Sequence, residues 1–227
     1  MTTQRFDVYA AIHKAYRSFM GDTLARLGRI DLDDAAEAAV VLAQVRALLQ
    51  SLRHHIAHED THVHPMLANT GAMPASVREH DEHLAEIARL EALAAAVGAA
   101  PRAERDAAAH RLYLALSRAV GGQLLHMLGE EQANNLVLWA HYDDAQIGAM
   151  HDRLVADVKP EVMSEIMGWM LPALTPAELA AVLGDMRAKA PPSAFAAVLE
   201  LARDRLAPAR FDRLQRWLRD ESEQALA

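Results

Sequence analysis

The sequence contains no cysteine, which excludes disulfide bonds, zinc fingers and cysteine-ligated iron–sulfur clusters. Aromatic residues make up only 5% of the 227 residues, and the β-branched residues that favour strands are sparse. Alanine and leucine dominate instead, together with glutamate, arginine and methionine, all of which favour helices. The composition therefore predicts an all-α fold, and the length allows one sizeable core, alone or with an appendage.

A surplus of basic residues is also missing. Lys and Arg number 23 against 31 Asp and Glu, so the formal net charge is −8. Binding to nucleic acid without sequence preference needs clustered Lys and Arg, and we therefore expect no nucleic-acid partner. The sequence shows no run of 18 apolar residues, and its first residues are too polar for a signal peptide. We expect no membrane span and a cytoplasmic protein.

Helical periodicity runs through almost the whole chain and is interrupted by proline and glycine. Four long helices with short loops are expected over about residues 6–28, 31–67, 76–97 and 102–140. Shorter helices, joined at prolines, are expected over about residues 144–157, 160–171, 176–189, 192–205 and 208–224. We predict an up-down four-helix bundle over residues 1–140 and a C-terminal helical appendage over 141–227, packed on or beside it.

Two helix starts carry recognisable signals. Asp31 or Asp33 is expected to cap the second long helix, because an aspartate side chain accepts hydrogen bonds from the free N–H groups of a first turn. Thr175 and Glu178 have the spacing of a capping box, with a proline between them at the first helical position.

Histidine, by contrast, is abundant, with twelve residues that concentrate between His54 and His83. On the second predicted helix, three histidines and a glutamate share a stripe with apolar residues such as Leu48 and Met66. These four polar residues are His55, His58, Glu59 and His62. The stripe should face the core, whereas His54 and His64 point elsewhere and are expected to be solvated.

The other long helices also place histidine on the apolar face. The residues concerned are His13, His80 and His126. Glu130 follows His126 by one helical turn, on the stripe of Ala133 and Val137. Buried imidazole and carboxylate groups cost free energy unless they are paired, and groups of both kinds offset one another best around cations. Such donors suit divalent first-row metals, including Fe and Mn.

Four segments resemble those of the hemerythrin-like (HHE cation-binding) family. They are I-H-K-A-Y-R around His13, H-I-A-H-E-D-T-H-V-H-P from His55 to Pro65, R-E-H-D-E-H around His80 and H-M-L-G-E-E around His126. Each motif is weak alone, but the four stand in the family's order and span about residues 5–140. The resemblance implies two iron ions, or a mixed Fe/Mn or other divalent pair, with an oxo or hydroxo bridge.

Carried over by position, the resemblance assigns six metal ligands, with Glu59 and Glu130 as bridging carboxylates. The six are His13, His55, Glu59, His80, His126 and Glu130.

Oxygen carriers of the family have two histidines four apart on the third helix, whereas His80 and His83 are three apart. His83 is therefore an additional ligand or an outer partner of the centre. The carriers also place the acid five residues after the fourth-helix histidine, which would select Glu131; the helical angle favours Glu130.

Four further residues are candidates for the surroundings of the centre. His58 and His62 are extra histidines on the metal-facing stripe, and we expect further ligands, outer hydrogen-bond donors or proton carriers there. Tyr9 and Tyr16 stand one turn either side of His13, so they either line the site or pack in the core.

Blander interpretations compete with the metal centre. A single histidine on an apolar face is more simply explained as a hydrogen-bonded core residue, and a single His/Glu pair as an exposed pair that stabilises its helix. Only the four helices taken together favour a metal site. A ferritin-like di-iron site needs two Glu-x-x-His motifs. Glu59 and His62 provide one, but Ala133 stands where the second histidine belongs.

The resemblance points to a site more firmly than to an activity. It implies an open position for a small diatomic or peroxide ligand, and we expect a protein that binds or senses O2 or NO. A di-iron enzyme acting on peroxide or NO is the first alternative, and metal storage or a purely structural bundle is the second. The sequence does not decide whether the protein is an enzyme. The C-terminal helices permit self-association or a protein partner without predicting either.

Overall fold

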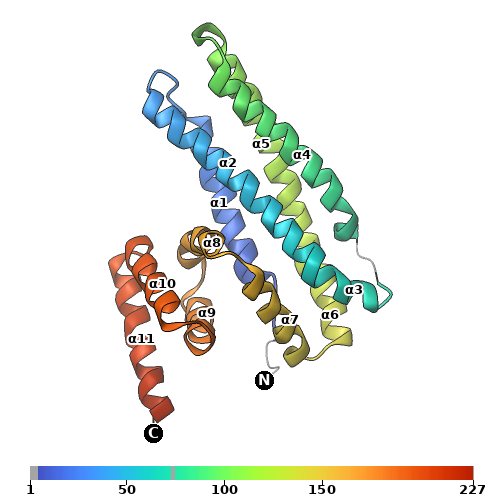
Figure 1. Ribbon diagram of the computed structural model, residues 1–227, viewed down its shortest axis with the longest axis vertical. Helices are drawn as coiled ribbons and strands as arrows, with labels where there is room; N and C mark the ends of the chain where they lie inside the picture. The colour runs from blue at the N-terminus through green and yellow to red at the C-terminus, as the bar shows by residue number, and fades with distance from the viewer. Residues whose placement is uncertain (1–4, 73–74, 227) are drawn as a thin grey trace. The chain divides into compact units, whose positions relative to one another are not determined.

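The computed structural model describes residues 5–72 and 75–226, and these residues are helical with no strand among them (Figure 1). The predicted all-α class is confirmed. The chain forms two compact units, which are Met1–Ala10 with Phe19–Val158 (unit 1) and Ala11–Ser18 with Lys159–Ala227 (unit 2). The division after Val158 lies beyond the predicted bundle end at residue 140, because α7 (Asp144–Asp157) packs on elements of unit 1.

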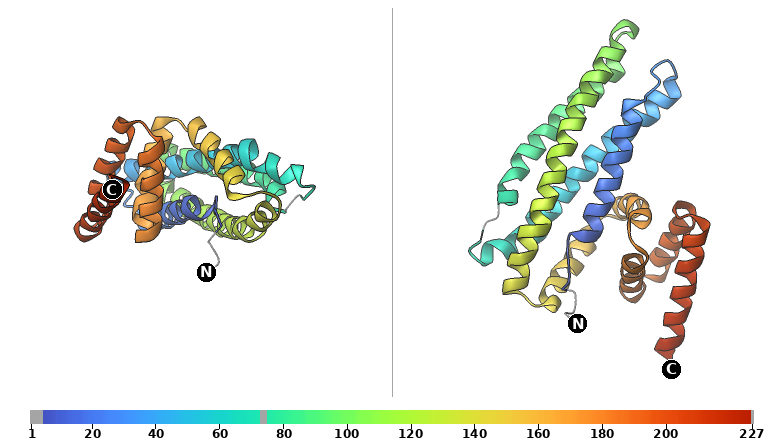
Figure 2. Two further views of the ribbon diagram at one scale, coloured as in Figure 1. Left: turned by 90° about the horizontal axis from the view of Figure 1, so that it is seen from below. Right: turned by 180° about the vertical axis from the view of Figure 1, so that it is seen from behind.

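Long helices form most of unit 1 and run alongside one another (Figures 1 and 2). They are α1 (Ala10–Gly28, from Phe19 onward), α2 (Ala35–His58), α4 (Ala75–Ala99) and α5 (Arg102–Gly129). α4 packs on both α2 and α5. Gln44 of α2 donates a hydrogen bond to the Thr23 hydroxyl of α1 over 3.0 Å. The two helices are thereby tied together by a partly buried polar contact.

The cap of α2 differs from the prediction. Asp34 accepts hydrogen bonds from the backbone N–H groups of Ala36 and Glu37 at 2.9 and 3.0 Å. Asp31 instead accepts from the N–H of Asp33 in the preceding turn, at 2.9 Å. The prediction of Asp31 or Asp33 as the cap was wrong, because these residues build the turn that leads into the helix.

Two of the long helices continue through a π-helical turn. α2 runs into η1 (Glu59–Val63) and then α3 (His64–Asn69), and α5 runs into η2 (Glu130–Asn134) and then α6 (Asn135–His141). A π turn inserts one residue relative to an α-helix, so the buried face beyond it moves by one position. Each π turn begins at one of the two predicted bridging glutamates.

The shifted face overturns part of the predicted apolar stripes. After η1, Leu67 is fully buried, whereas Met66 is only half-buried. After η2, Leu138 is fully buried, whereas Val137 is only half-buried. Ala133, predicted on the buried stripe, is exposed. A helical wheel assumes the same rotation for every residue. It therefore misplaces the residues that follow a π turn, which contains one residue more than an α-helical turn.

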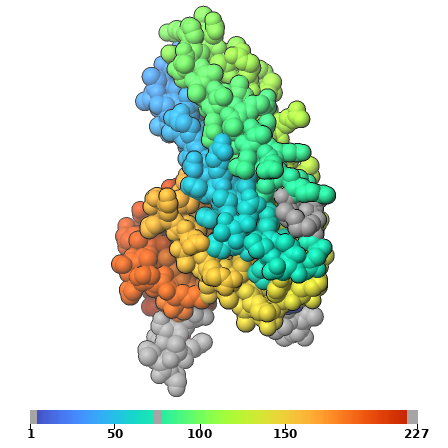
Figure 3. Space-filling view, turned by 45° about the vertical axis from the view of Figure 1, so that its right-hand side comes forward, coloured from blue at the N-terminus to red at the C-terminus, as the bar shows by residue number. Residues whose placement is uncertain are grey.

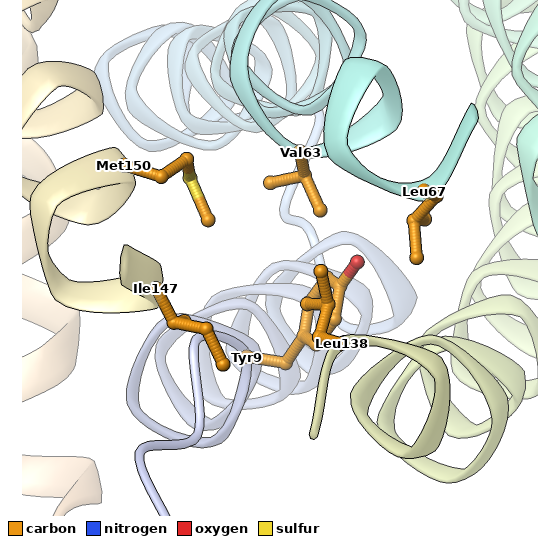
Figure 4. Packing of buried hydrophobic residues seen from close by; sticks show 6 residues of the cluster. All are labelled: Tyr9, Val63, Leu67, Leu138, Ile147 and Met150. Atoms are coloured by element: carbon orange, nitrogen blue, oxygen red, sulfur yellow. The ribbon is translucent and has the colours of Figure 1, made fainter. Parts of the chain in front are cut away.

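An apolar cluster closes one end of unit 1 (Figure 4). Its members come from the start of α1, from both π-containing helices and from α7, and they are Tyr9, Val63, Leu67, Leu138, Ile147 and Met150. Arg5 holds the start of α7 through an ion pair with Asp144 at 2.6 Å. The cluster lies at the end of the helices that carries η1 and η2, so it shields that end from water.

One described helix has the length and apolar character of a membrane span. The run Ala35–Asn69, which joins α2 to α3, contains an 18-residue window with a mean hydropathy of 1.3. Length and hydropathy alone are weak evidence, because the core helix of a globular protein meets the same criteria. Val45, Leu48 and Leu49 of this helix are fully buried in unit 1. We interpret it as a core helix.

Unit 2 is built from α8 (Pro160–Ala173), α9 (Pro176–Lys189), α10 (Pro192–Arg205), α11 (Pro208–Leu226) and the segment Ala11–Ser18. α10 packs on α8 and α9, and α11 packs on α9. The capping box of Thr175 and Glu178 is confirmed. Lys14 pairs with Glu178 at 2.5 Å. Arg210 donates to the carbonyls of Pro172 and Leu174, which closes the end of α8.

Replacing Leu138 with alanine tests the apolar cluster. Leu138 is fully buried, so we expect Leu138→Ala to lower the free energy of unfolding by about 2–5 kcal/mol. Leu136, two residues earlier on α6, is 63% exposed, and Leu136→Ala should change it by less than about 0.5 kcal/mol. Denaturant unfolding followed by circular dichroism measures both. Equal losses in the two variants would contradict the register shift at η2.

Candidate metal centre

All six predicted ligands are buried. Their exposed fractions range from 0% for His13 and Glu130 to 8% for His55. Five of the six lie in unit 1, on α2, η1, α4, α5 and η2, and they are His55, Glu59, His80, His126 and Glu130. This set is called the inner cluster below. Burying five ionisable side chains costs free energy unless they interact with one another or with a bound ion. The distances between them therefore indicate their role.

Four members of the inner cluster converge closely. Each of Glu59, His80, His126 and Glu130 offers one ligand atom within 4.8 Å of the other three. His80 Nε2 lies 3.4 Å from Glu59 Oε2, and His126 Nε2 lies 3.5 Å from Glu130 Oε2. The four donors thus surround one position with two nitrogen and two oxygen atoms.

The fifth member extends the cluster on the other side of Glu59. His55 offers an atom within 4.8 Å of ligand atoms of Glu59 and Glu130. His55 Nε2 is 3.3 Å from Glu59 Oε1, whereas Glu59 Oε2 faces His80. The two oxygens of Glu59 therefore face different histidines. A carboxylate used in this way can belong to two ion positions at once.

Burial of two acids together has a clear electrostatic cost. Burial raises the pKa of Glu130 to about 10, and the nearby charge of Glu59 raises it as well. Burial also raises the pKa of Tyr9 well above its usual value, with Glu59 and Glu130 adding to the effect. The hydroxyl of Tyr9 accepts a hydrogen bond from Asn134 Nδ2 at 3.0 Å. A bound cation would reverse this balance and favour the ionised carboxylates.

The ring nitrogens of His80 and His126 have defined roles. His80 Nδ1 lies 2.8 Å from Asp60 Oδ1, and His126 Nδ1 lies 2.9 Å from Glu79 Oε2. An ionised carboxylate only accepts hydrogen bonds, so both Nδ1 atoms donate and both Nε2 lone pairs face inward. The two Nε2 atoms are 3.2 Å apart. Two lone pairs at this distance repel unless a proton or a metal ion lies between the rings.

Sequence reasoning missed Asp60 and Glu79. Both are partly exposed, with side-chain exposed fractions of 48% and 44%, so neither belongs to an apolar stripe. A usable signal was their position, because each stands next to a predicted ligand, Glu59 or His80. Carboxylates that accept from the second nitrogen of a ligand histidine fix its orientation and strengthen its donor character.

The extra histidines of α2 and η1 do not join the inner cluster. His62 Nε2 pairs with Asp157 Oδ2 of α7 at 2.9 Å. His58 is half-buried, and burial together with His54 lowers its pKa. His64, predicted to be solvated, is buried, and its Nδ1 lies 2.8 Å from Asp60 Oδ1. That prediction was wrong because the π turn rotates His64 toward the interior.

His83 and Glu131 were alternatives at the third and fourth helices. The rings of His83 and His126 meet edge-on with centroids 4.6 Å apart. His83 groups with Glu79 and with one member of the inner cluster, His126, but with none of its other members. Glu131 is half-buried and belongs to none of the candidate ligand groups formed by the described residues. The geometry thus favours Glu130 over Glu131, as the helical angle predicted.

His13 and Tyr16 lie in the segment Ala11–Ser18, which belongs to unit 2. Both side chains are buried, with exposed fractions of 0% and 3%. His13 stands one turn after Tyr9 on the same face of α1. Its role as the sixth ligand stays a prediction.

The donor set of the inner cluster suits a metal ion. It offers imidazole nitrogen and carboxylate oxygen with no sulfur, and hydrogen bonds to outer carboxylates fix the orientation of two of its histidines. Buried groups of this kind cost free energy that cation binding offsets. The cluster can therefore hold a metal ion, and nitrogen and oxygen donors together favour a divalent first-row metal.

Replacing each of the adjacent acids of η2 tests the ligand assignment. We expect Glu130→Ala to lose bound metal, because Glu130 lies in both ligand groups, and Glu131→Ala to keep it. Metal content per folded chain, measured by elemental analysis after gel filtration, decides between them. Loss of metal from Glu131→Ala alone would show that the helix-four ligand is misassigned.

Replacing Asp60 tests the outer hydrogen bond to His80. Asp60→Asn keeps the size of the side chain but weakens the acceptor for His80 Nδ1, and we expect metal affinity to fall by about 10–100-fold. Competition with a chromophoric chelator measures the affinity. Asp81→Asn, at an exposed position next to His80, is the matched control and should leave affinity unchanged. An unchanged affinity in Asp60→Asn would argue against this role.

Comparison with known proteins adds no further constraint. No family model, curated protein or solved structure matches this chain. The chemistry of the inner cluster consequently rests on its own donor atoms, on their burial and on the two outer carboxylates. These features concern metal binding.

Proposed function

We propose that the protein is a hemerythrin-like non-haem di-iron protein that binds or senses O2 or NO. One observation carries the proposal: two groups of buried donors share Glu59 and Glu130. Shared carboxylates between separate histidines are the arrangement expected for two neighbouring ions. A single-ion site would need neither the second oxygen of Glu59 nor His55 beyond it.

The finer architecture belongs to the same proposal. We infer an up-down four-helix bundle made of α1, α2 with α3, α4, and α5 with α6, each of which carries at least one of the predicted ligands. His13 would complete the set from α1. Support comes from its full burial and from its position one turn after Tyr9, a residue whose pKa Glu59 and Glu130 both raise.

The chain's own residues would hold such a centre and limit the access of water to it. His55, His80 and His126 present ring nitrogens to it, and Asp60 and Glu79 keep the last two rings in the orientation required. The apolar cluster around Leu138 and Tyr9 limits access of water. When bound, two iron ions would supply reversible coordination of a small ligand. With these features the residues orient the ions and keep bulk solvent out.

A second candidate is a di-iron enzyme acting on peroxide or NO. Asp60, half-exposed, contacts both His64 and His80 at 2.8 Å, so a hydrogen-bonded route joins solvent to the inner cluster. Such a route would serve turnover that consumes protons. His58 and His62 lie outside the inner cluster and give no support to either candidate. Metal storage is a third possibility with no observation of its own.

We also propose a cytoplasmic location, since the one helix among the described residues that is apolar enough for a membrane is interpreted as a core helix. The exposed faces of the C-terminal helices leave room for a homo-oligomer or a protein partner.

The test combines metal content with ligand titration. We expect about two iron ions per chain after anaerobic loading with Fe(II), and reversible spectral changes with O2 or NO without sustained turnover. Sustained O2 evolution from peroxide, or repeated oxidation of a reductant, would favour the enzyme instead. A chain that takes up no metal from anaerobic Fe(II) would rule out the proposal and leave the histidines as hydrogen-bonded core.

A further inference from the structure

A second group of possible metal ligands lies beside the inner cluster, on α4 and α5. Glu79, His83 and His126 each offer one atom within 4.8 Å of the other two. His126 belongs to both groups, because its Nε2 faces Glu130 at 3.5 Å and its Nδ1 faces Glu79 at 2.9 Å. The imidazole of His126 therefore separates an inner ligand position from an outer one.

The outer group is the more accessible of the two. The side chain of Glu79 is 44% exposed, whereas those of Glu59 and Glu130 are 3% and 0% exposed. α4, which carries Glu79 and His83, forms part of the outer face of unit 1 (Figure 3). An ion arriving from solution on this side meets the Glu79 carboxylate before it reaches either inner carboxylate.

His83 has a free donor atom at this place. Its Nε2 is buried and has no hydrogen-bond partner among the described residues. An imidazole nitrogen is a metal ligand, and an unsatisfied buried nitrogen favours a state in which it finds a partner.

The corresponding group on the other side of the inner cluster is different. Asp60, His64 and His80 also lie within 4.8 Å of one another. There, however, Asp60 Oδ1 lies 2.8 Å from both His64 Nδ1 and His80 Nδ1, so both histidines already donate to it. A cation would have to displace two donated protons. At Glu79 it displaces only the one from His126.

We propose that Glu79, His83 and the Nδ1 atom of His126 form an outer cation site, which captures a divalent first-row metal ion on its way to the inner cluster. The inference rests on the proposed function, because it supplies the ions of that centre. Repulsion between nearby cations makes the outer site a transit position once the inner cluster is filled.

The ligand exchange at His126 conserves its protons. When the ion is captured, a metal–Nδ1 bond forms and the Nδ1 proton moves to Nε2. When the ion passes inward, the metal–Nδ1 bond breaks, a metal–Nε2 bond forms, and the proton returns to Nδ1. Glu79 then accepts the hydrogen bond seen in the structure. The neutral ring thus begins and ends with one proton, and no electron is transferred.

Uptake kinetics with Co²⁺ as the probe test the capture step. We expect His83→Ala to slow Co²⁺ uptake by about tenfold or more while the final metal content per chain stays unchanged. Glu82→Gln, at an exposed position beside His83 on α4, is the matched control and should load at the rate of the unaltered chain. Stopped-flow absorbance gives the rate, and elemental analysis gives the final content. Unaltered uptake in His83→Ala would overturn the proposal.

Equilibrium binding to a chain with a weakened inner cluster tests the site itself. Glu130→Gln removes the shared inner charge with almost no change of volume. We expect this variant to retain one weakly bound Co²⁺, and the further change His83→Ala to abolish it. Circular dichroism verifies that both variants are folded. Retention of that ion without His83 would overturn the assignment of the outer ligands.

The two experiments separate this inference from the proposed function. If the unaltered chain binds two ions and His83→Ala changes neither measurement, only the outer site fails. If the unaltered chain binds one ion that needs His83 but not Glu130, the outer site stands and the di-iron proposal fails. If the unaltered chain binds no ion, both fail.

Discussion

The burial of Glu59 beside Glu130 is the constraint on which the rest of unit 1 depends. Two carboxylates removed from water lose hydration and repel each other, and only positive charge between or beside them offsets that cost. Protons can supply it, which is why burial raises the pKa of Glu130 to about 10. The surrounding histidines offer a different solution, because the inward lone pairs of His80 and His126 can bind a cation. The helices that carry these residues must therefore pack so that the acids and the histidines lie together.

The sequence predicted the helices and the level of the site well, for physical reasons. Proline and glycine mark the joins, so the predicted bounds of α7, α9 and α10 coincide with the observed ones. Apolar periodicity placed His55, Glu59, His80, His126 and Glu130 on buried faces, and each is buried. These features are local, since each depends on one helix and the spacing of its own side chains.

What the sequence could not predict depends on departures from regular spacing and on partial exposure. The π turns move Leu67 and Leu138 onto the buried face and turn His64 inward. No residue type marks a π turn in the sequence, because a π turn is stabilised by the packing of the helical segments before and after it. Asp60 and Glu79 escaped notice for another reason: a carboxylate that is half in water looks like any surface acid until the histidine behind it is seen.

The π turns also determine where these helices tolerate a change of length. Because a π turn holds one residue more than the α-helical turn that it replaces, deleting one residue within η1 or η2 would restore an α-helical turn and leave Leu67 or Leu138 on the buried face. An insertion or deletion further along α3 or α6 has no such turn to absorb it, and it would exchange buried and exposed side chains beyond that point. Among related chains, a length difference of one residue is therefore expected within Glu59–Val63 or Glu130–Asn134 and not in the regular helices that follow them.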